Sequence, residues 1–258
     1  KISFLKYTVE WIKKIKTIIS LYERYDCNIM YIDRSNLSFA AILSLFKYKV
    51  LWRCLGVAPY HLRKESRKIH MRLLYMIDSF FLMMPISLTI CTLDGSPWKS
   101  ILKRMWWRKR LIVIPNGVDT EVFNSMDKRD CQKQLGWDYD KKHILFAANP
   151  SRPEKNYALA KEAFSILNNE NIEFHSLIDV LPKHMPLWMN SADVVFLSSL
   201  REGSPNVIKE AMACNRPIVS TDVGDIKEVI ENTKGCYLTS FDPRDIADKI
   251  NMSISFGK

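Results

Sequence analysis

The sequence has 258 residues, of which 47% are hydrophobic and 26% are charged, and its formal net charge at pH 7 is +10. This apolar content suffices for one large or two small hydrophobic cores, which excludes a chain too polar to fold and indicates a globular protein. The charge is unevenly placed, because residues 1–124 contain 21 Lys+Arg and 9 Asp+Glu, whereas residues 125–258 contain 17 and 19. The basic character therefore belongs to the N-terminal half.

The cysteines and the hydropathy of the sequence argue against a zinc protein, a disulfide-rich protein and a membrane-spanning protein. The six cysteines are dispersed without a C-x-x-C motif, and no histidines have the paired spacing of metal ligands. The sequence therefore predicts neither a zinc site nor a disulfide framework, and it favours reduced thiols in the cytoplasm. The most apolar segment, Ser79 to Thr92, has 14 residues and contains Pro85, which is too short for a membrane span of about 20 residues. No signal peptide is recognisable.

The N-terminal half alternates between helical and strand patterns. Phe4 to Tyr25 has the 3.6-residue apolar period of an amphipathic helix. Further helices are expected at Leu37–Phe46, His61–Met84 and Ser96–Arg110, and strands at Cys27–Asp33, Lys49–Leu55, Ile86–Thr92 and Leu111–Pro115. This alternation predicts a parallel, doubly wound sheet.

The C-terminal half repeats the alternation after a polar linker and connecting helix at Asp127–Lys142. Strands are expected at His143–Ala148, Ile172–Asp179, Asp193–Ser199 and Pro217–Thr221, and helices at Asn156–Asn168, Pro186–Ala192, Ile226–Asn232 and after the pair Asp242-Pro243. Within the Pro186–Ala192 helix, Trp188 and Met189 are expected to pack in the core.

The most informative stretch is Arg201 to Pro217, REGSPNVIKEAMACNRP, which lies between two apolar strands. It predicts a turn and a helix, with Ser204 as N-cap, Pro205 as the first helical residue and Asn215 in a left-handed conformation after the helix. Backbone N–H groups at the start of such a helix favour an anion such as a diphosphate. The turn therefore predicts an anion-binding site.

Two carboxylates flank this turn. Glu210 would lie about 7.5 Å along the helix axis from Pro205, at about 1.5 Å per residue, which is similar to the distance between the phosphates and the ribose of a nucleotide. Carboxylates only accept hydrogen bonds, so Glu202 and Glu210 are suited to hold hydroxyl groups. The alternative is that both are ordinary helix-start and surface carboxylates.

Glu202 and Glu210 are separated by seven residues within EGSPNVIKEAMACNRPIVSTDVGD. This segment resembles the E-x7-E signature of retaining GT-B glycosyltransferases of family 4. The resemblance implies that Glu202 contacts the donor sugar near the reacting centre and that Glu210 binds the ribose. The residues expected to bind the substrate beside Glu210 are Gly203, Ser204, Pro205 and Asn206.

A basic pair occupies another strand-to-helix turn, the loop NPSRPEK that follows His143–Ala148. Ligands usually bind at this edge of open α/β sheets. In the resembled family, a basic pair here binds the donor diphosphate and neutralises the leaving group in place of a metal ion. The resemblance therefore implies these catalytic roles for Lys155 and Arg152, with no metal and no cofactor. Family members commonly have the Arg five residues before the Lys, where this sequence has Pro150, and the alternative for either residue is a solvated loop charge.

The segment IPNGVD with Phe123 resembles the point at which the N-terminal domain of family 4 enzymes leads into the second domain. It predicts a partial N-terminal, acceptor-side Rossmann-like domain at residues 1–123 and a C-terminal nucleotide-sugar donor-binding domain at residues 124–258. The first domain is expected to be incomplete, because GT-B enzymes usually begin with a strand and a Gly-containing loop that this sequence lacks.

The sequence thus predicts an α/β, GT-B-like glycosyltransferase of the hexosyltransferase type. It would transfer a sugar from a nucleotide-diphosphate sugar to a glycan or lipid-linked acceptor in polysaccharide biosynthesis, with retention implied by the family, and would not bind nucleic acid. Two alternatives stay open, a nucleotide-sugar epimerase of GT-B fold and a non-catalytic nucleotide-sugar-binding fragment.

The predicted helix Ser96–Arg110 combines tryptophans with basic residues, SPWKSILKRMWWRKR. This composition suits an anionic membrane surface, where indole rings lie at the headgroup level and basic side chains are attracted to the lipids. It predicts a cytoplasmic protein peripherally bound to the inner face of the membrane. The alternative is that a tryptophan packs against a neighbouring helix and that the charges are solvated.

Overall fold

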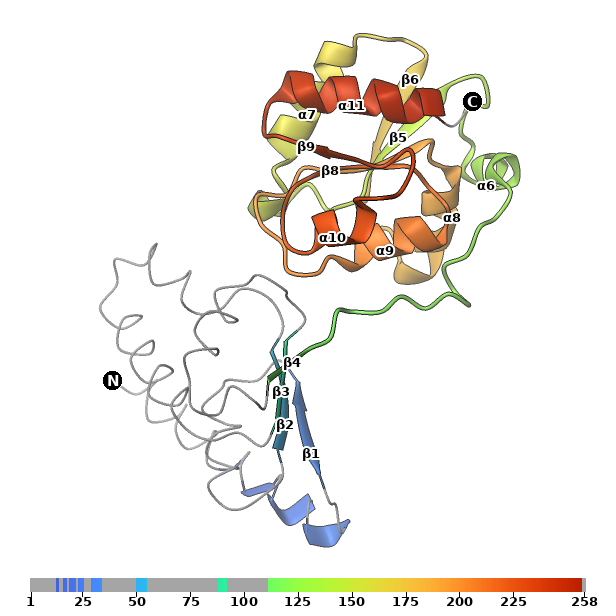
Figure 1. The fold of residues 1–258 in the computed structure, drawn as a ribbon. Helices are drawn as coiled ribbons and strands as arrows, with labels where there is room; N and C mark the ends of the chain where they lie inside the picture. Colours follow the sequence, from blue (N-terminus) through green and yellow to red (C-terminus); the bar gives the residue numbers. More distant parts are fainter. Residues whose placement is uncertain are drawn as a thin grey trace, which may run out of the picture. The chain divides into compact units, whose positions relative to one another are not determined.

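The structure, a computed structural model, describes residues 111–256 continuously and, before them, three short strands and scattered positions between 13 and 29. The chain divides into two compact units, Lys1–Ile114 and Pro115–Lys258 (Figure 1). The sequence-based boundary at Phe123 lies further along the chain, inside the second unit. Each unit is described by itself below.

The first unit contains a parallel sheet. Its strands are β1 (Met30–Asp33), β2 (Val50–Cys54), β3 (Leu88–Cys91) and β4 (Leu111–Val113), which pair in the order β1-β2-β3-β4. All four strands were predicted, with longer bounds. The predicted helices Leu37–Phe46, His61–Met84 and Ser96–Arg110, and most of Phe4–Tyr25, lie outside the described residues.

The second unit is built on a five-stranded parallel sheet. Its strands are β5 (Lys142–Phe146), β6 (Ile172–Ser176), β7 (Val194–Leu197), β8 (Ile218–Thr221) and β9 (Tyr237–Thr239), in the order β6-β5-β7-β8-β9. Every residue of β7 and β8 is buried, as expected of short β-branched runs in a parallel sheet covered on both faces. The prediction of a parallel sheet is confirmed, whereas the three-residue strand β9 was missed because it is too short for a detectable pattern.

Helices cover both faces of this sheet, so the unit is doubly wound. They are α6 (Lys128–Leu135), α7 (Tyr157–Leu167), α8 (Met185–Ser191), α9 (Asn206–Ala213), α10 (Ile226–Ile230) and α11 (Pro243–Phe256), with short 3-10 turns η2 (Pro153–Lys155) and η3 (Pro182–His184). In Figure 1, α7 and α11 lie on one face and α8, α9 and α10 on the other. The Oδ1 atom of Asp242 accepts the N–H of Arg244 at 2.8 Å, which confirms the predicted start of α11.

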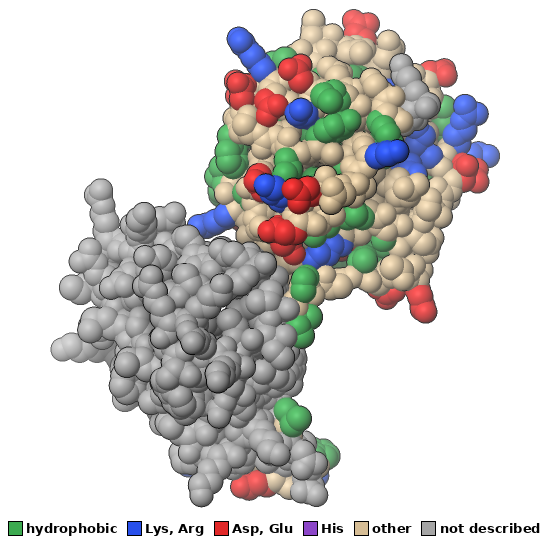
Figure 2. Space-filling view, viewed as in Figure 1, with side chains coloured by type: hydrophobic (Ala, Val, Ile, Leu, Met, Phe, Trp, Pro, Cys, Tyr) green, Lys and Arg blue, Asp and Glu red, His purple; other side chains and the backbone are tan. Residues whose placement is uncertain are grey.

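The core of the second unit lies between the sheet and these helices. Phe146 of β5 and Phe196 of β7 are fully buried, with ring centroids 6.1 Å apart. Met189 is fully buried and Trp188 packs against the same core, as predicted. On the face of this unit seen in Figure 2, acidic and basic side chains are interspersed, in keeping with the balanced composition of residues 125–258.

In the part of the chain that the structure describes, no helix is both long and apolar enough to cross a bilayer.

Asp193 connects α6, β5 and β7 at the edge of the sheet where the strands begin. It precedes β7, and its Oδ1 accepts hydrogen bonds from Nζ of Lys128 in α6 at 2.8 Å and from Nζ of Lys142 in β5 at 3.0 Å. Its Oδ2 accepts the backbone N–H of His143 at 2.9 Å. Burial raises the pKa of this carboxyl group, but the hydrogen bonds outweigh burial and hold the pKa below its usual value. Asp193 therefore stabilises the folded state as an anion.

We expect Asp193→Asn to lower the free energy of unfolding at pH 7 by about 1.5–3 kcal/mol, the value of a hydrogen-bonded charge. Because the folded-state pKa is depressed, the contribution of Asp193 is fully present above the usual pKa of an aspartate and is lost as the pH falls through the folded-state pKa. Urea unfolding between pH 3 and 7 should therefore show a weaker acid dependence in this variant. The exposed Asp248→Asn variant is the control, and identical acid dependence in the wild type and Asp193→Asn would contradict the assignment.

Candidate active site

The strand order of the second unit locates the edge at which a ligand is expected. In open parallel sheets, ligands bind outside the carboxyl ends of the strands, at the point where the strand order reverses. Here the reversal lies between β5 and β7, because β6 extends the sheet on one side of β5 while β7, β8 and β9 extend it on the other. The loops that follow β5 and β7 carry Lys155 and Glu202.

Lys155 and Glu202 are in direct contact. Nζ of Lys155, the last residue of η2, lies 2.5 Å from Oε1 of Glu202, and the two side chains are only 12% and 14% exposed. Oγ of Ser199 donates to the same carboxylate oxygen at 2.6 Å. Two residues separated by 47 positions in the sequence are thus brought together at the predicted edge of the sheet, and Ser199 joins them as a residue that sequence reasoning missed.

Backbone contacts hold the two loops in place. The N–H of Leu200 donates to the carbonyl of Glu154 at 2.9 Å. The hydroxyl of Ser198, at the end of β7, donates to the carbonyls of Lys155 and Asn156 at 3.0 and 3.1 Å. These bonds join the loop after β5 to the end of β7, so Lys155 rests on a fixed backbone.

Arg152 is placed differently from Lys155. Its side chain is 59% exposed, and its Nε and NH2 atoms bind Oε1 of Glu154 at 2.8 and 2.5 Å. An exposed pair of this kind contributes little to stability. The backbone N–H of Lys155 donates to the carbonyl of Arg152 at 2.9 Å, but no described contact joins the Arg152 side chain to the Lys155–Glu202 pair, so its catalytic role stays a prediction.

The turn after Glu202 differs from the predicted one at Ser204. Helix α9 begins at Asn206, and Pro205 is its N-cap residue, with φ −70° and ψ 118° and no side-chain cap. The Ser204 hydroxyl instead donates to Oδ2 of Asp225 at 2.6 Å. The predicted N-cap at Ser204 is wrong, because the helix starts one residue later than predicted and the Ser204 oxygen accepts from Nζ of Lys209 instead of from a helix N–H. Asn215 has φ 54°, which confirms its left-handed conformation after the helix.

Lys209 and Asp225 form a buried cluster with Ser204 that sequence reasoning missed. Nζ of Lys209 contacts the Ser204 hydroxyl and lies 3.2 Å from Oδ2 of Asp225. The backbone N–H of Asp225 donates to the carbonyl of Gly203 at 3.1 Å, while its Oδ1 is buried without a hydrogen-bond partner among the described residues. The only sequence signal was a lysine directly before Glu210 on a half-buried helix. The cluster determines the shape of the turn.

The predicted substrate-binding residues of this turn differ in exposure. Ser204 and Pro205 are buried, Gly203 is half-buried and Asn206 is exposed. The side-chain amide of Asn116 donates to the carbonyl of Ser204 at 3.3 Å. Asn116 is therefore in contact with the turn, which its position in the sequence did not indicate.

Glu210 lies on α9, in the turn of helix that follows these residues. Its side chain is half-buried, and burial raises the pKa of its carboxyl group. No donor among the described residues hydrogen-bonds this carboxylate. A half-buried acceptor with this environment is suited to the hydroxyl groups of a ligand.

Comparisons with known proteins find similar sequences and similar folds. Residues 140–255 match the family model described as Glycosyl transferases group 1. The chain is 30% identical over 172 residues to the D-inositol 3-phosphate glycosyltransferase of Paenarthrobacter aurescens, an alignment covering 55% of this chain and 42% of that protein. It is 25% identical over 134 residues to the putative teichuronic acid biosynthesis glycosyltransferase TuaC of Bacillus subtilis, covering 45% of this chain and 34% of that protein. The chain thus spans less than half the length of these relatives.

Among solved structures, Anabaena HepE in complex with UDP and glucose matches with a TM-score of 0.68 and 17% identity, over 95% of this chain and 74% of that one. This likeness confirms the predicted α/β, GT-B-like fold. The matched residues 140–255 contain Lys155, Glu202 and Glu210. On this sequence match and this fold, residues 140–255 are similar to the group 1 glycosyl transferases.

Proposed function

We propose that this protein transfers a hexose from a nucleotide-diphosphate sugar to a glycan or lipid-linked acceptor, with retention of configuration as in family 4. The observation that carries the proposal is the contact between Lys155 and Glu202 at the carboxyl ends of β5 and β7. The solved structures of HepE are complexes with UDP and glucose and with UDP-glucose, which supports a nucleotide-sugar donor. The role named for TuaC, teichuronic acid biosynthesis, supports a polysaccharide product.

The proposed mechanism needs a site that stabilises a departing diphosphate. When the bond between the sugar and the diphosphate breaks, the electron pair leaves with the phosphate oxygen, and the acceptor hydroxyl forms the new bond and passes its proton to the departing diphosphate. Negative charge on the diphosphate therefore grows in the transition state, next to the ammonium group of Lys155. A cation fixed in advance in a half-buried site stabilises that charge without reorganisation. Metal and cofactor are not required by this proposal.

Glu202 and the turn would position the sugar and the diphosphate. Glu202 shares its Oε1 with Lys155 and Ser199, so in this proposal its Oε2 atom accepts hydroxyl groups of the transferred sugar. The N–H groups at the start of α9 would face the diphosphate, where the helix dipole favours negative charge. Holding both reactants in one geometry supplies the second part of the rate enhancement.

Glu210 completes the donor site by binding the ribose. It lies four residues after Asn206, the first residue of α9, which is about 6 Å along the helix axis at about 1.5 Å per residue. The start of α9 can therefore contact the phosphates of a nucleotide while Glu210 contacts its ribose. Its carboxylate has no donor among the described residues, so ribose hydroxyls would supply the hydrogen bonds that burial removes. This arrangement favours a nucleotide over a bare sugar phosphate.

We expect Glu210→Ala to raise the Kd of the nucleoside diphosphate by about 10–100-fold, because a hydrogen bond to a charged group contributes roughly 1.5–3 kcal/mol. The fold should persist, because the carboxylate makes no described hydrogen bond that the variant would break. Isothermal titration calorimetry measures the Kd, and the exposed Glu162→Ala variant in α7 is the matched control. An unchanged Kd in Glu210→Ala would remove the ribose assignment.

Two measurements on the full-length gene product distinguish a glycosyltransferase from an epimerase and from a non-catalytic binding protein. A thermal-shift screen of common nucleotide sugars identifies the donor, because a ligand that binds only the folded state raises Tm. Incubation of that donor with glycan and lipid-linked acceptors then separates the functions. Transfer with a retained anomer supports the proposal, epimerised free donor indicates an epimerase, and binding without turnover indicates a non-catalytic protein.

We also propose that the protein lies in the cytoplasm, on the inner face of the membrane. The three cysteines that the structure describes, Cys131, Cys214 and Cys236, are free thiols, which suits a reducing compartment. The net charge of +12 in residues 1–124 and the tryptophans of 96–110 supply the attraction to anionic lipid. A lipid-linked acceptor would then be reached at the membrane surface.

We expect the protein to co-sediment with anionic vesicles at low salt and to be released at high salt. Each basic residue near such a surface contributes about 1 kcal/mol, and this attraction is screened by salt. Charge reversal at Arg108, Lys109 and Arg110 should weaken binding by at least tenfold, whereas reversal of Lys161 in the second unit should not. Failure to bind at low salt, or equal binding of the reversed variant, would exclude membrane docking through this segment.

A further inference from the structure

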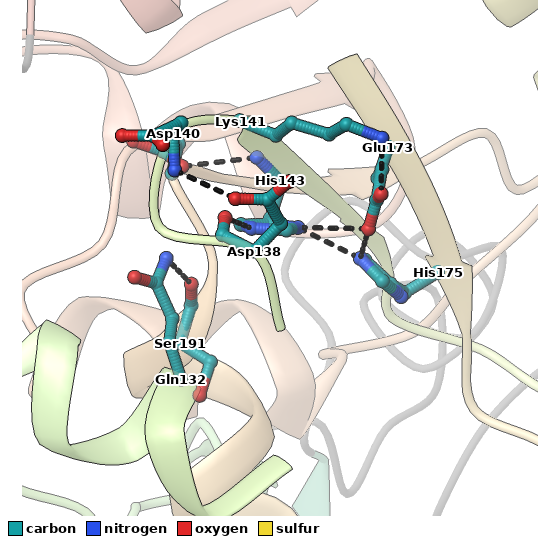
Figure 3. A network of polar contacts seen from close by, with 9 residues as sticks. Gln132, Asp138, Asp140, Lys141, His143, Glu173, His175 and Ser191 are labelled. Atoms are coloured by element: carbon teal, nitrogen blue, oxygen red, sulfur yellow. Dashed lines mark hydrogen bonds and ion pairs between the residues drawn. The ribbon is translucent and has the colours of Figure 1, made fainter. Parts of the chain in front are cut away.

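A second cluster of chemically active side chains lies on neighbouring strands, away from Lys155 and Glu202. Figure 3 shows His143 of β5 facing Glu173 and His175 of the edge strand β6. Among the described residues, these three form a group of His, Cys, Asp or Glu whose ligand atoms lie within 4.8 Å of one another. Their positions differ from those of the proposed donor site, because His143 and Glu173 lie near the beginning of their strands, whereas Lys155 follows the end of β5.

The three ligand atoms surround a single point. Nδ1 of His143 lies 2.9 Å from Nε2 of His175, and these atoms lie 3.7 and 3.8 Å from Oε2 of Glu173. A triangle with these sides has a centre about 2.0 Å from each corner, which matches the Zn–N and Zn–O bond lengths of about 2.0–2.2 Å. A cation slightly out of the plane of the three atoms would meet ordinary bond lengths with little movement of the side chains.

Contacts with Asp138 and Lys141 orient the ligand atoms of His143 and Glu173. Nε2 of His143 lies 2.7 Å from the backbone carbonyl of Asp138. Because a carbonyl only accepts, Nε2 carries a proton, and in the tautomer protonated only there the lone pair of Nδ1 points toward the centre of the cluster. Nζ of Lys141 binds Oε1 of Glu173 at 2.8 Å, so Oε2 is the oxygen left for the cluster. Such outer contacts orient the ligands of many metal sites.

His175 and its surroundings also suit a metal ligand. The His175 ring is half-buried and lies beside the His143 ring, with ring centroids 5.1 Å apart. The Trp137 ring stacks on the His175 ring with centroids 3.7 Å apart and an interplanar angle of 8°, which leaves the nitrogen at the ring edge accessible. The His143, His175 and Glu173 side chains are 0%, 17% and 33% exposed. Solvent therefore reaches the cluster from the Glu173 side.

We propose that His143, Glu173 and His175 bind a divalent transition-metal ion of the Zn²⁺ class, at a site separate from the donor site. Two imidazoles and one carboxylate form a typical three-residue zinc set, and water would fill the fourth position on the exposed side. Binding needs only a shift of the His175 proton from Nε2 to Nδ1, because Lys141 contacts Oε1 of Glu173 and leaves Oε2 for the cation. The ion would join the edge strand β6 to β5. Without an ion, the same atoms form a His175 to His143 hydrogen bond.

The test is equilibrium dialysis of the purified chain against Zn²⁺, with bound metal measured by atomic absorption. We expect one bound Zn²⁺ in the wild type that is absent, or at least tenfold weaker, in His175→Gln and in Glu173→Gln. His184→Gln is the matched control, because His184 lies on η3 and is exposed. The fully buried His143 is left unchanged, and the Tm of each variant without metal confirms that it folds.

The Tm shift on metal binding and the absorption of bound Co²⁺ distinguish a specific metal site from non-specific binding at the surface. Zn²⁺ at about 100 times its Kd should raise Tm by the order of 5 °C in the wild type and in His184→Gln, and not in Glu173→Gln. Co²⁺ should occupy the same site and produce visible absorption bands that disappear in His175→Gln. Equal Zn²⁺ binding by His175→Gln and the wild type, or no binding by the wild type at micromolar Zn²⁺, would overturn the proposal. Sugar transfer is not needed for any of these readouts, so the proposed function can fail independently.

Discussion

Replacing Lys155 by alanine should lower the kcat of sugar transfer by roughly 10²–10³-fold, the effect of removing one group that stabilises developing charge. The affinity for the donor should change much less, since the charge on the diphosphate grows only as the bond to the sugar breaks. The structure strengthens the case for Lys155, because its ammonium group is fixed against Glu202 in a site that is largely closed to solvent. A solvated lysine would have neither property.

Initial-rate kinetics and donor titration of the same preparations measure this split between kcat and affinity. Lys161→Ala, an exposed lysine of α7, is the matched control and should retain full activity. Arg152→Ala should lose less activity than Lys155→Ala, since Arg152 is 59% exposed and bound to Glu154. Equal and small losses in both variants would show that the two residues are solvated loop charges. Unchanged Tm values are needed to exclude a general loss of folding.

Gly224→Ala should be among the most destabilising single substitutions in the second unit. Gly224 has φ +67°, and a Cβ atom added there would overlap the backbone carbonyl oxygen of Gly203. The left-handed conformation costs a non-glycine residue about 1–2 kcal/mol, and overpacking against a fixed backbone costs about 1–3 kcal/mol more. We therefore expect the free energy of unfolding to fall by about 2–5 kcal/mol.

The same substitution should also impair ligand binding, because Gly203 belongs to the turn that precedes α9 and accepts the N–H of Asp225. Urea unfolding and nucleotide titration measure the two effects. Gly117→Ala is the control, since a Cβ atom at Gly117 meets nothing within 4 Å, and it should leave both quantities unchanged. Wild-type stability in Gly224→Ala would show that the loops after β7 and β8 do not approach each other this closely.

Local patterns in the sequence were sufficient for most of the fold. The apolar runs that became β5, β7 and β8 were recognisable because short, buried parallel strands are continuous and β-branched. The helix that carries Glu210 was recognisable from Pro205 before it and Asn215 after it, although its first residue was misplaced by one. Such predictions succeed where one segment of chain contains all the information that decides its conformation.

Contacts between segments had to come from the tertiary structure. The sequence could nominate Lys155 and Glu202 separately, but only the order of the strands places the loops after β5 and β7 side by side. The Ser204 hydroxyl donates to Asp225, 21 residues away in the sequence. This contact could not be predicted, because only folding brings the acceptor close to the hydroxyl. His143 and His175 have no metal-ligand spacing in the sequence, since the parallel pairing of β5 with β6, and not their separation along the chain, places their nitrogens 2.9 Å apart.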